Sequence, residues 1–138
     1  MKRILLASDG SEHALRTTKK AVELASLVPD SVITVIYVVD SDQSKTDVLA
    51  NQNLVQVDAK REERLKVTEE MLTEAGVDYK VEIKKGEPGP TIIKYANQEE
   101  FDVLIIGSRG LNRFQEFVLG SVSHNVAKHA HCPVMIVK

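Results

Sequence analysis

Five short apolar runs, separated by segments with helical periodicity, constrain the fold of this chain more than any other feature of its sequence. The runs span residues 2–8, 32–39, 79–84, 103–107 and 134–137. Their length and their content of β-branched residues are typical of buried strands. Strict alternation of strands and helices predicts a doubly wound α/β fold, with a five-stranded parallel sheet and helices on both faces. We expect the strand order 3-2-1-4-5.

Four segments between and after these runs have the apolar spacing of helices. The first should begin after Ser11, a suitable N-cap, and end at Pro29-Asp30. The second is long and charged, follows a polar stretch over residues 41–53, and should stop at Gly76. The third should span from Pro88 to the residue before Phe101. The fourth should begin at Ser121, with these apolar residues: Val122, Val126 and Ala127.

Composition indicates one ordinary globular domain over residues 1–138. Hydrophobic residues make up 43% and charged residues 28% of the chain. A net charge of −2 gives no electrostatic footprint for nucleic acid or an anionic membrane. The single Cys132 cannot form an internal disulfide, and no run approaches the ~20 apolar residues of a membrane span. By elimination, we expect a cytoplasmic protein that binds a small molecule or another protein.

Two glycine-containing segments follow the fourth apolar run. Doubly wound sheets bind ligands where the winding reverses, beside the first strand. The run 103–107 leads into Gly107-Ser108-Arg109-Gly110, and Gly120-Ser121-Val122-Ser123 begins the last expected helix. Glycines allow close approach and positive φ, and helix N-termini attract anions, so the two segments predict a phosphate cradle. The alternative is that Gly107 and Gly110 merely turn the chain and Gly120 merely starts a helix.

Asp9 follows the first apolar run, at the end of a strand expected to be central. A carboxylate there lies where this class of fold binds ligands. Because a carboxylate repels phosphates, a Mg²⁺ or Mn²⁺ ion between them is a reasonable expectation. The alternative role for Asp9 is to cap the helix that begins near Ser11.

The glycine segments also carry a family resemblance. The pattern G-x2-G-x9-G-S, formed by Gly107, Gly110, Gly120 and Ser121, resembles the signature of ATP-binding universal stress proteins. Residues 2–11 are similar to the first strand and D-G-S turn of that family. Residues 35–40 are similar to its second strand, and residues 131–137 to its C-P-V terminal strand. The resemblance implies a Rossmann-like fold of the adenine nucleotide alpha hydrolase type.

The resemblance also implies roles for particular residues. The four signature residues would contact the phosphates and ribose of ATP, and Asp9 would face the ribose or a phosphate-bound cation. Backbone at Val38 would recognise the adenine, and Ala7 and Ser8 would line the same wall. Val122 and Ser123 belong to the same helix start. Arg109 either pairs with phosphate or is a solvated loop arginine.

The last apolar run predicts a homodimer. Val134, Met135, Ile136 and Val137 have no charge or proline among them, and a strand at the sheet edge would leave this surface uncovered. The universal stress family resembles this arrangement, since it pairs that strand with its symmetry mate. The alternative is a strand buried at the centre of the sheet.

Other site chemistries have weaker support. His129, His131 and Cys132 resemble part of a metal site, but no second cluster completes four ligands, which favours a structural role. The sequence has no Walker A motif and no G-x-G-x-x-G after a strand. Three functions remain open: a nucleotide-dependent sensor or interaction module, an ATP-hydrolysing or adenylyl-transferring enzyme, and a nucleotide-independent dimeric scaffold. We expect the first, with slow ATP hydrolysis or none.

Overall fold

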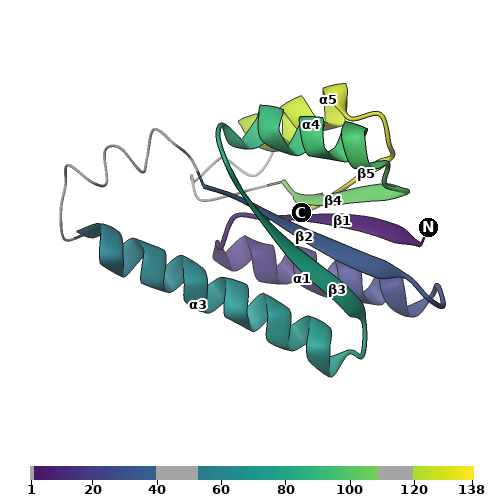
Figure 1. Cartoon of the computed structure of the whole chain (residues 1–138), viewed down its shortest axis with the longest axis horizontal. Helices are drawn as coiled ribbons and strands as arrows, with labels where there is room; N and C mark the ends of the chain where they lie inside the picture. The colour runs from purple at the N-terminus through teal and green to yellow at the C-terminus, as the bar shows by residue number, and fades with distance from the viewer. Residues whose placement is uncertain (1, 40–52, 109–119) are drawn as a thin grey trace.

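Five parallel strands form one sheet in the order β3-β2-β1-β4-β5 (Figure 1). The structure is a computed structural model, and it describes residues 2–39, 53–108 and 120–138. Both the parallel sheet and the strand order predicted from the sequence are confirmed. The strands are β1 (Arg3–Ser8), β2 (Val32–Val39), β3 (Asp78–Lys85), β4 (Val103–Gly107) and β5 (Val134–Val137).

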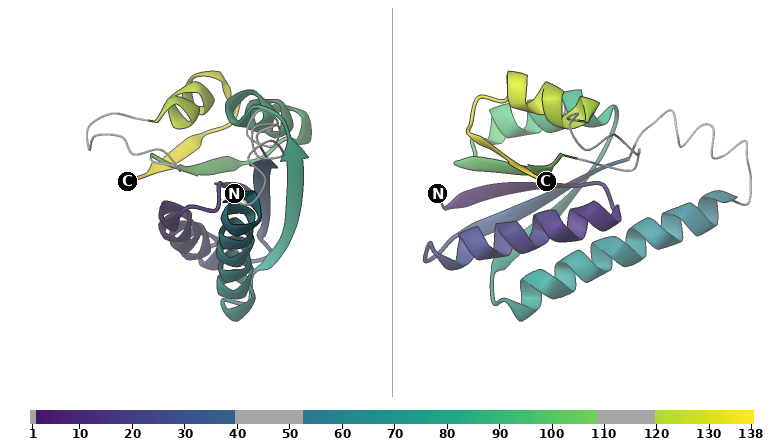
Figure 2. Two further views of the ribbon diagram at one scale, coloured as in Figure 1. Left: turned by 90° about the vertical axis from the view of Figure 1, so that its left-hand side faces the viewer. Right: turned by 180° about the vertical axis from the view of Figure 1, so that it is seen from behind.

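Among the described residues, four helices cover the two faces of the sheet. Helices α1 (Glu12–Ser26) and α3 (Asn53–Glu74) pack on one face, and α4 (Pro88–Glu99) and α5 (Ser121–His129) pack on the other (Figure 2). The chain therefore has the three layers expected of right-handed crossovers between parallel strands. No helix within the described residues is long and apolar enough to cross a membrane.

The helix ends follow local sequence chemistry. Ser11 caps α1, because its Oγ accepts the N–H of Ala14 at 3.3 Å. Gly76 follows α3 with a φ of +70°, the left-handed conformation that glycine adopts most readily. Two prolines, Pro88 and Pro90, lie in the first turn of α4, where no intrahelical donor is lost.

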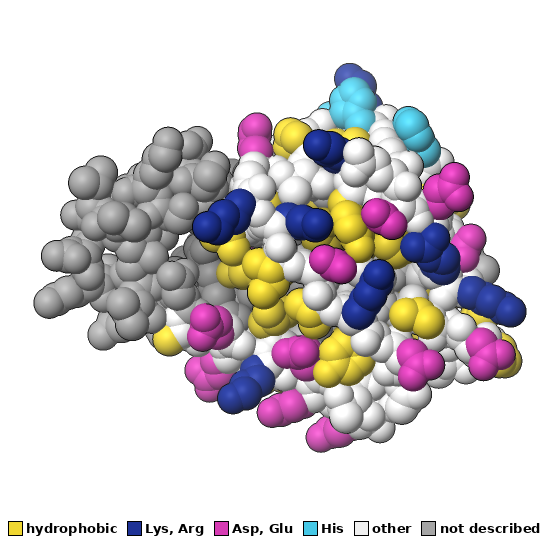
Figure 3. Space-filling view, viewed as in Figure 1, with side chains coloured by type: hydrophobic (Ala, Val, Ile, Leu, Met, Phe, Trp, Pro, Cys, Tyr) yellow, Lys and Arg dark blue, Asp and Glu magenta, His cyan; other side chains and the backbone are white. Residues whose placement is uncertain are grey.

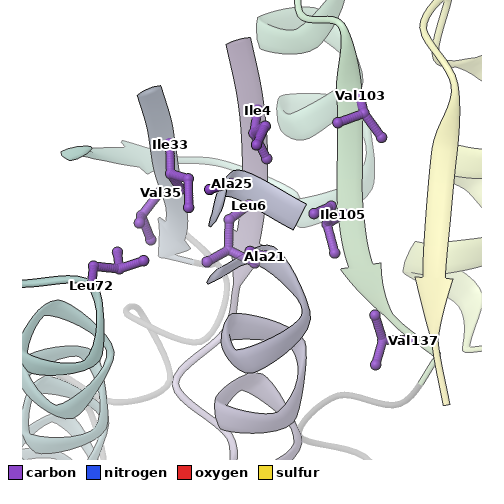
Figure 4. Packing of buried hydrophobic residues seen from close by; sticks show 10 residues of the cluster. All are labelled: Ile4, Leu6, Ala21, Ala25, Ile33, Val35, Leu72, Val103, Ile105 and Val137. Carbon is purple, nitrogen blue, oxygen red and sulfur yellow. The ribbon is translucent and has the colours of Figure 1, made fainter. Parts of the chain in front are cut away.

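The core consists of two apolar clusters, one on each side of the sheet. In β1, Ile4 and Leu6 face α1 and α3, whereas Leu5 and Ala7 face α4 and α5. Figure 4 shows the first cluster, where Leu72 of α3 meets the strands. The side chains from residue 4 to residue 6 have no solvent exposure. Burying each such Leu or Ile stabilises the fold by about 1.5–3 kcal/mol, so these residues anchor β1 in the core.

Some boundaries differ from those expected. Helix α1 ends at Ser26 rather than at Pro29-Asp30, because Asp30 has a φ of +63° and lies in the turn that leads to β2. Asn53 belongs to α3 instead of the preceding loop, and residues 40–52 lie outside the described part of the chain. On α5, Ala127 is exposed and Ser123 is buried in its place. The Ser123 hydroxyl can be buried because it donates to the Gly120 carbonyl at 3.0 Å.

Candidate functional site

Strands β1 and β4 separate at their carboxyl ends. Their pairing extends from Ile4↔Val103 to Leu6↔Ile105. Beyond that point β1 continues to Ser8 beside β2, and β4 continues to Gly107 beside β5. The strand ends therefore diverge at the place where the winding of the sheet reverses, which is where doubly wound folds bind ligands.

Ser8 places a buried hydroxyl at this divergence. Ala7 and Ser8 are 8% and 6% exposed. Among the side chains of the described residues, Ser8 Oγ is the buried polar atom that has no hydrogen-bond partner. An unpaired buried hydroxyl lowers the stability of a fold by about 1–3 kcal/mol. A hydrogen bond from Ser8 Oγ to a ligand or an ordered solvent molecule would remove this cost.

The turn after β1 presents Asp9. Its Oδ1 accepts the N–H of Ser11 at 3.0 Å, and Gly10 between them is buried with a φ of +71°. The alternative role of Asp9 as the cap of α1 is not what the structure shows, because Ser11 caps that helix. The carboxylate instead holds its own turn through one oxygen, and the half-buried side chain remains at the carboxyl end of the sheet.

The end of β4 and the start of α5 form a second wall. The N–H of Gly120 donates to the Ser108 carbonyl at 3.0 Å, and the Ser108 N–H donates to the Val137 carbonyl at 2.8 Å. The N-cap of α5 is Gly120, and no side chain of the described residues caps this helix, whose first residues are Ser121, Val122 and Ser123. The N–H groups of an uncapped first turn, together with the helix dipole, favour an anion.

The glycines of this wall do not require left-handed backbone. Gly120 has a φ of −58° and a ψ of 152°, a conformation open to any residue, and Gly107 is likewise not among the positive-φ glycines. Our expectation of positive φ therefore fails at these two positions. Backbone conformation therefore does not explain why glycine occupies position 120, which is buried.

Val38 directs a carbonyl toward the same end of the sheet. Val39 accepts the N–H of Gly86 at 3.0 Å on the β3 side. Because successive peptides of a parallel strand face opposite neighbours, the Val38 carbonyl faces the β1 side. The last residue of β2 that pairs with β1 is Tyr37, opposite Ser8. The Val38 carbonyl therefore lies just past the end of β1, at the predicted position for base recognition.

Arg64 makes a contact with Gly10 that the sequence analysis missed. Its Nη1 donates to the Gly10 carbonyl at 3.1 Å, so the middle of α3 reaches the turn that carries Asp9. No pattern in the sequence indicates this contact, because Arg64 is one of many charged residues on a helix far along the chain. Two predicted residues, Arg109 and Gly110, lie outside the described residues.

The possible metal cluster near the C-terminus has a structural explanation. Asn97 accepts the N–H of His131 at 2.9 Å and donates to the His129 carbonyl at 3.4 Å, which ties α4 to the end of α5. Both imidazoles are exposed, and burial raises the pKa of the Cys132 thiol, which disfavours the thiolate that binds metals. Within the described residues, no three His, Cys, Asp or Glu side chains are grouped to hold an ion.

Charge on the surface is mixed. On the face shown in Figure 3, acidic and basic side chains of the described residues alternate, and apolar side chains appear between them. This pattern is typical of a solvated surface.

Comparison with known proteins defines the family. The model of the universal stress protein family matches residues 1–138. Universal stress protein MJ0531 of Methanocaldococcus jannaschii is 34% identical over 140 residues, which cover 99% of this chain and 82% of that protein. This chain belongs to the universal stress protein family.

Solved structures support the same assignment. The structure of hypothetical protein MJ0577 has a TM-score of 0.84 and 29% identity, and the match covers 99% of this chain and 95% of that one. A universal stress protein in complex with cAMP has a TM-score of 0.70 at 22% identity, with 99% and 95% covered. A family protein of Arabidopsis thaliana with AMP bound has a TM-score of 0.70 at 24% identity, with 100% and 92% covered. The last two share the fold of this chain.

Proposed function

We propose that this chain binds ATP at the carboxyl ends of β1, β2 and β4, and that nucleotide occupancy changes its surface for a protein partner. The observation that carries the proposal is the uncapped start of α5, which the Gly120–Ser108 hydrogen bond fixes beside the divergence of β1 and β4. An anion-binding helix end at a switch point is suited to a nucleotide phosphate.

The phosphates would lie against the two glycine segments. Gly107 and Gly120 have no side chain to block close approach, and the first-turn N–H groups at Ser121, Val122 and Ser123 would donate to phosphate oxygens. Gly110 belongs to the glycine signature in the sequence, and Arg109 lies beside it. We assign both residues to the phosphates because of this sequence pattern. The orphaned Ser8 hydroxyl fits a ligand on the wall that it forms with Ala7.

The base and ribose would lie toward β2 and the turn after β1. The Val38 carbonyl is an acceptor, which suits the 6-amino group of adenine and opposes the 6-carbonyl of guanine. Asp9 would accept from ribose hydroxyls or hold a Mg²⁺ or Mn²⁺ ion shared with the phosphates. A single carboxylate is sufficient for such an ion, because Mg²⁺ is commonly bound by one or two carboxylates plus substrate phosphates.

Solved relatives support an adenine nucleotide as the ligand. One universal stress protein structure holds cAMP and another holds AMP. Both ligands share the adenosine group that the Val38 and Asp9 assignments address, and they differ in their phosphates. The choice of ATP therefore depends on the glycine signature of this chain.

We also propose a homodimer formed through β5. The strand is at the sheet edge, and Met135 is 38% exposed. The opposite edge strand, β3, carries several charged side chains that discourage pairing, whereas β5 has none. A two-fold axis perpendicular to β5 would pair this strand with its copy and close this edge. For localisation, our proposal remains the cytoplasm.

Native mass spectrometry of the purified protein tests the nucleotide assignment. We expect a mass shift that corresponds to ATP, or to ADP or AMP derived from it, and no shift in the folded Gly120→Val variant. A protein without bound nucleotide that also fails to take up added ATP would contradict the proposal.

A further inference from the structure

Arg64 connects α3 to the turn between β1 and α1. Its guanidinium Nη1 donates to the Gly10 carbonyl at 3.1 Å, and the two residues are 54 positions apart. The side chain is half-buried, so solvent competes less for this bond than at an exposed site. A hydrogen bond from a charged donor is about twice as strong as a neutral one.

The acceptor lies at the centre of the Asp9 turn. Gly10 is buried, has a left-handed backbone conformation and lies between Asp9 and Ser11. Asp9 Oδ1 holds the Ser11 N–H from inside the turn at 3.0 Å, and Arg64 holds the Gly10 carbonyl from outside it. The Gly10 carbonyl and the Ser11 N–H belong to the same peptide unit, so the two bonds hold that peptide from both sides. They thereby fix the direction in which the turn presents the Asp9 side chain.

Helix α3 is well packed against the rest of the protein just beyond Arg64. One turn further along α3, Thr68 is 1% exposed, and its Oγ1 donates to the Arg64 carbonyl at 3.2 Å. Leu72, another turn on, has no exposure and packs in the core cluster with β1 and β2. Arg64 therefore extends from a rigid part of the helix.

We infer that Arg64 is a positioning residue for nucleotide binding, which acts through the Asp9 turn and links occupancy of the site to α3. This inference rests on the proposed function, in which Asp9 contacts the bound ATP. If Arg64 orients Asp9, loss of its side chain weakens ATP binding without removing any atom that contacts the nucleotide.

Calorimetric titration with ATP tests the inference. We expect Arg64→Ala to raise the Kd about tenfold, the scale of one charge-assisted hydrogen bond. Arg64→Lys should restore part of the affinity, because an ammonium group can still donate to the Gly10 carbonyl. Lys66→Ala is the matched control, since Lys66 is an exposed cation on the same helix, and its Kd should not change. Equal affinities for Arg64→Ala and the unmodified protein would overturn the inference.

A double-mutant cycle separates positioning from a general structural role. In an Asp9→Ala background the oriented carboxylate is absent, so adding Arg64→Ala should weaken binding by less than about twofold. A full additional tenfold loss in that background would show that Arg64 acts on the nucleotide by another route, and it would overturn the inference.

A ligand-free measurement distinguishes failure of this inference from failure of the proposed function. Amide hydrogen exchange at Ser11 reports the turn, because this N–H is held by Asp9 Oδ1. We expect faster exchange at Ser11 in Arg64→Ala and no change in Lys66→Ala. Failure of the unmodified protein to bind ATP would contradict the proposed function. Unchanged Ser11 exchange in Arg64→Ala would contradict the hold of Arg64 on the turn, whether or not ATP binds.

Discussion

Gly120 donates its N–H to the Ser108 carbonyl at 3.0 Å, so the start of α5 is fixed to the end of β4. Residues 109–119 lie between these two positions in the sequence. Ser108 and Gly120 are both described, so their hydrogen bond by itself places the start of the helix beside the end of the strand. The Ser108 N–H in turn donates to the Val137 carbonyl at 2.8 Å. The start of α5 is therefore built onto two neighbouring strands of the sheet.

Gly120→Val should abolish or strongly weaken ATP binding. The backbone angles at Gly120 are open to any residue, so the new side chain costs little in conformation and instead fills the space that the phosphates need. We expect the Kd for ATP to rise at least tenfold, which corresponds to about 1.4 kcal/mol. Isothermal titration calorimetry measures the change.

Ala127→Val is the matched control for that substitution. Ala127 is exposed on the same helix, so this variant places the same valine side chain away from the site. Circular dichroism should show that both variants are folded. Unchanged ATP affinity in a folded Gly120→Val protein would remove the glycine segments from the site assignment.

Ser8 and Ser11 should respond in opposite ways to alanine substitution. Ser8→Ala removes a buried hydroxyl that has no partner among the described residues, so the free energy of unfolding should stay the same or rise by up to about 1 kcal/mol. Ser11→Ala removes the cap of α1 and should lower the free energy of unfolding by about 1 kcal/mol. Urea denaturation of both variants checks the contrast. A Ser8→Ala protein less stable than Ser11→Ala would show that Ser8 makes a structural bond.

The sequence predicts the sheet more fully than the site. β2, β4 and β5 have the predicted bounds, because each is a largely apolar run rich in β-branched residues. The contact between Arg64 and Gly10 has no such signal, since it depends on how α3 lies across the fold. The orphaned hydroxyl of Ser8 is also invisible in sequence, because hydrogen-bond satisfaction is a property of the packed state.

Backbone direction in β5 corrects the choice of a variant for the dimer. Met135→Pro is the obvious substitution from sequence, since it removes a ladder donor at the centre of the strand. The carbonyls of Pro133 and Val137 accept from β4, so by alternation the Met135 peptide also faces β4. The Val134 and Ile136 peptides face outward. Met135→Pro would therefore damage the subunit itself.

Ile136→Pro is the better test of the homodimer. It removes an outward-facing donor, so we expect dissociation at micromolar concentration with the sheet intact. Met135→Pro should instead lower the free energy of unfolding. Analytical ultracentrifugation and thermal unfolding together distinguish the two. A monomeric unmodified protein at high concentration would contradict the dimer.

ATP hydrolysis should be slow or absent. Asp9 is the one described carboxylate that we place at the site, and it already accepts the Ser11 N–H through one oxygen. Phosphoryl transfer also needs an oriented nucleophile and neutralised charge, and the sequence has no P-loop lysine. Phosphate release is measured with a coupled assay at saturating ATP. A steady rate of about 1 per second or faster, the range of kinases, would favour the enzyme alternative.

Comparative titration of ATP and GTP into the nucleotide-free protein tests the central claim most directly. In the proposed site the Val38 carbonyl would accept a hydrogen bond from the adenine amino group and would oppose the guanine carbonyl, so we expect ATP to bind at least tenfold more tightly, or about 1.4 kcal/mol. Saturable ATP binding with that preference supports an adenine site at the carboxyl ends of β1, β2 and β4. No binding of ATP, or equal affinity for the two nucleotides, would contradict it.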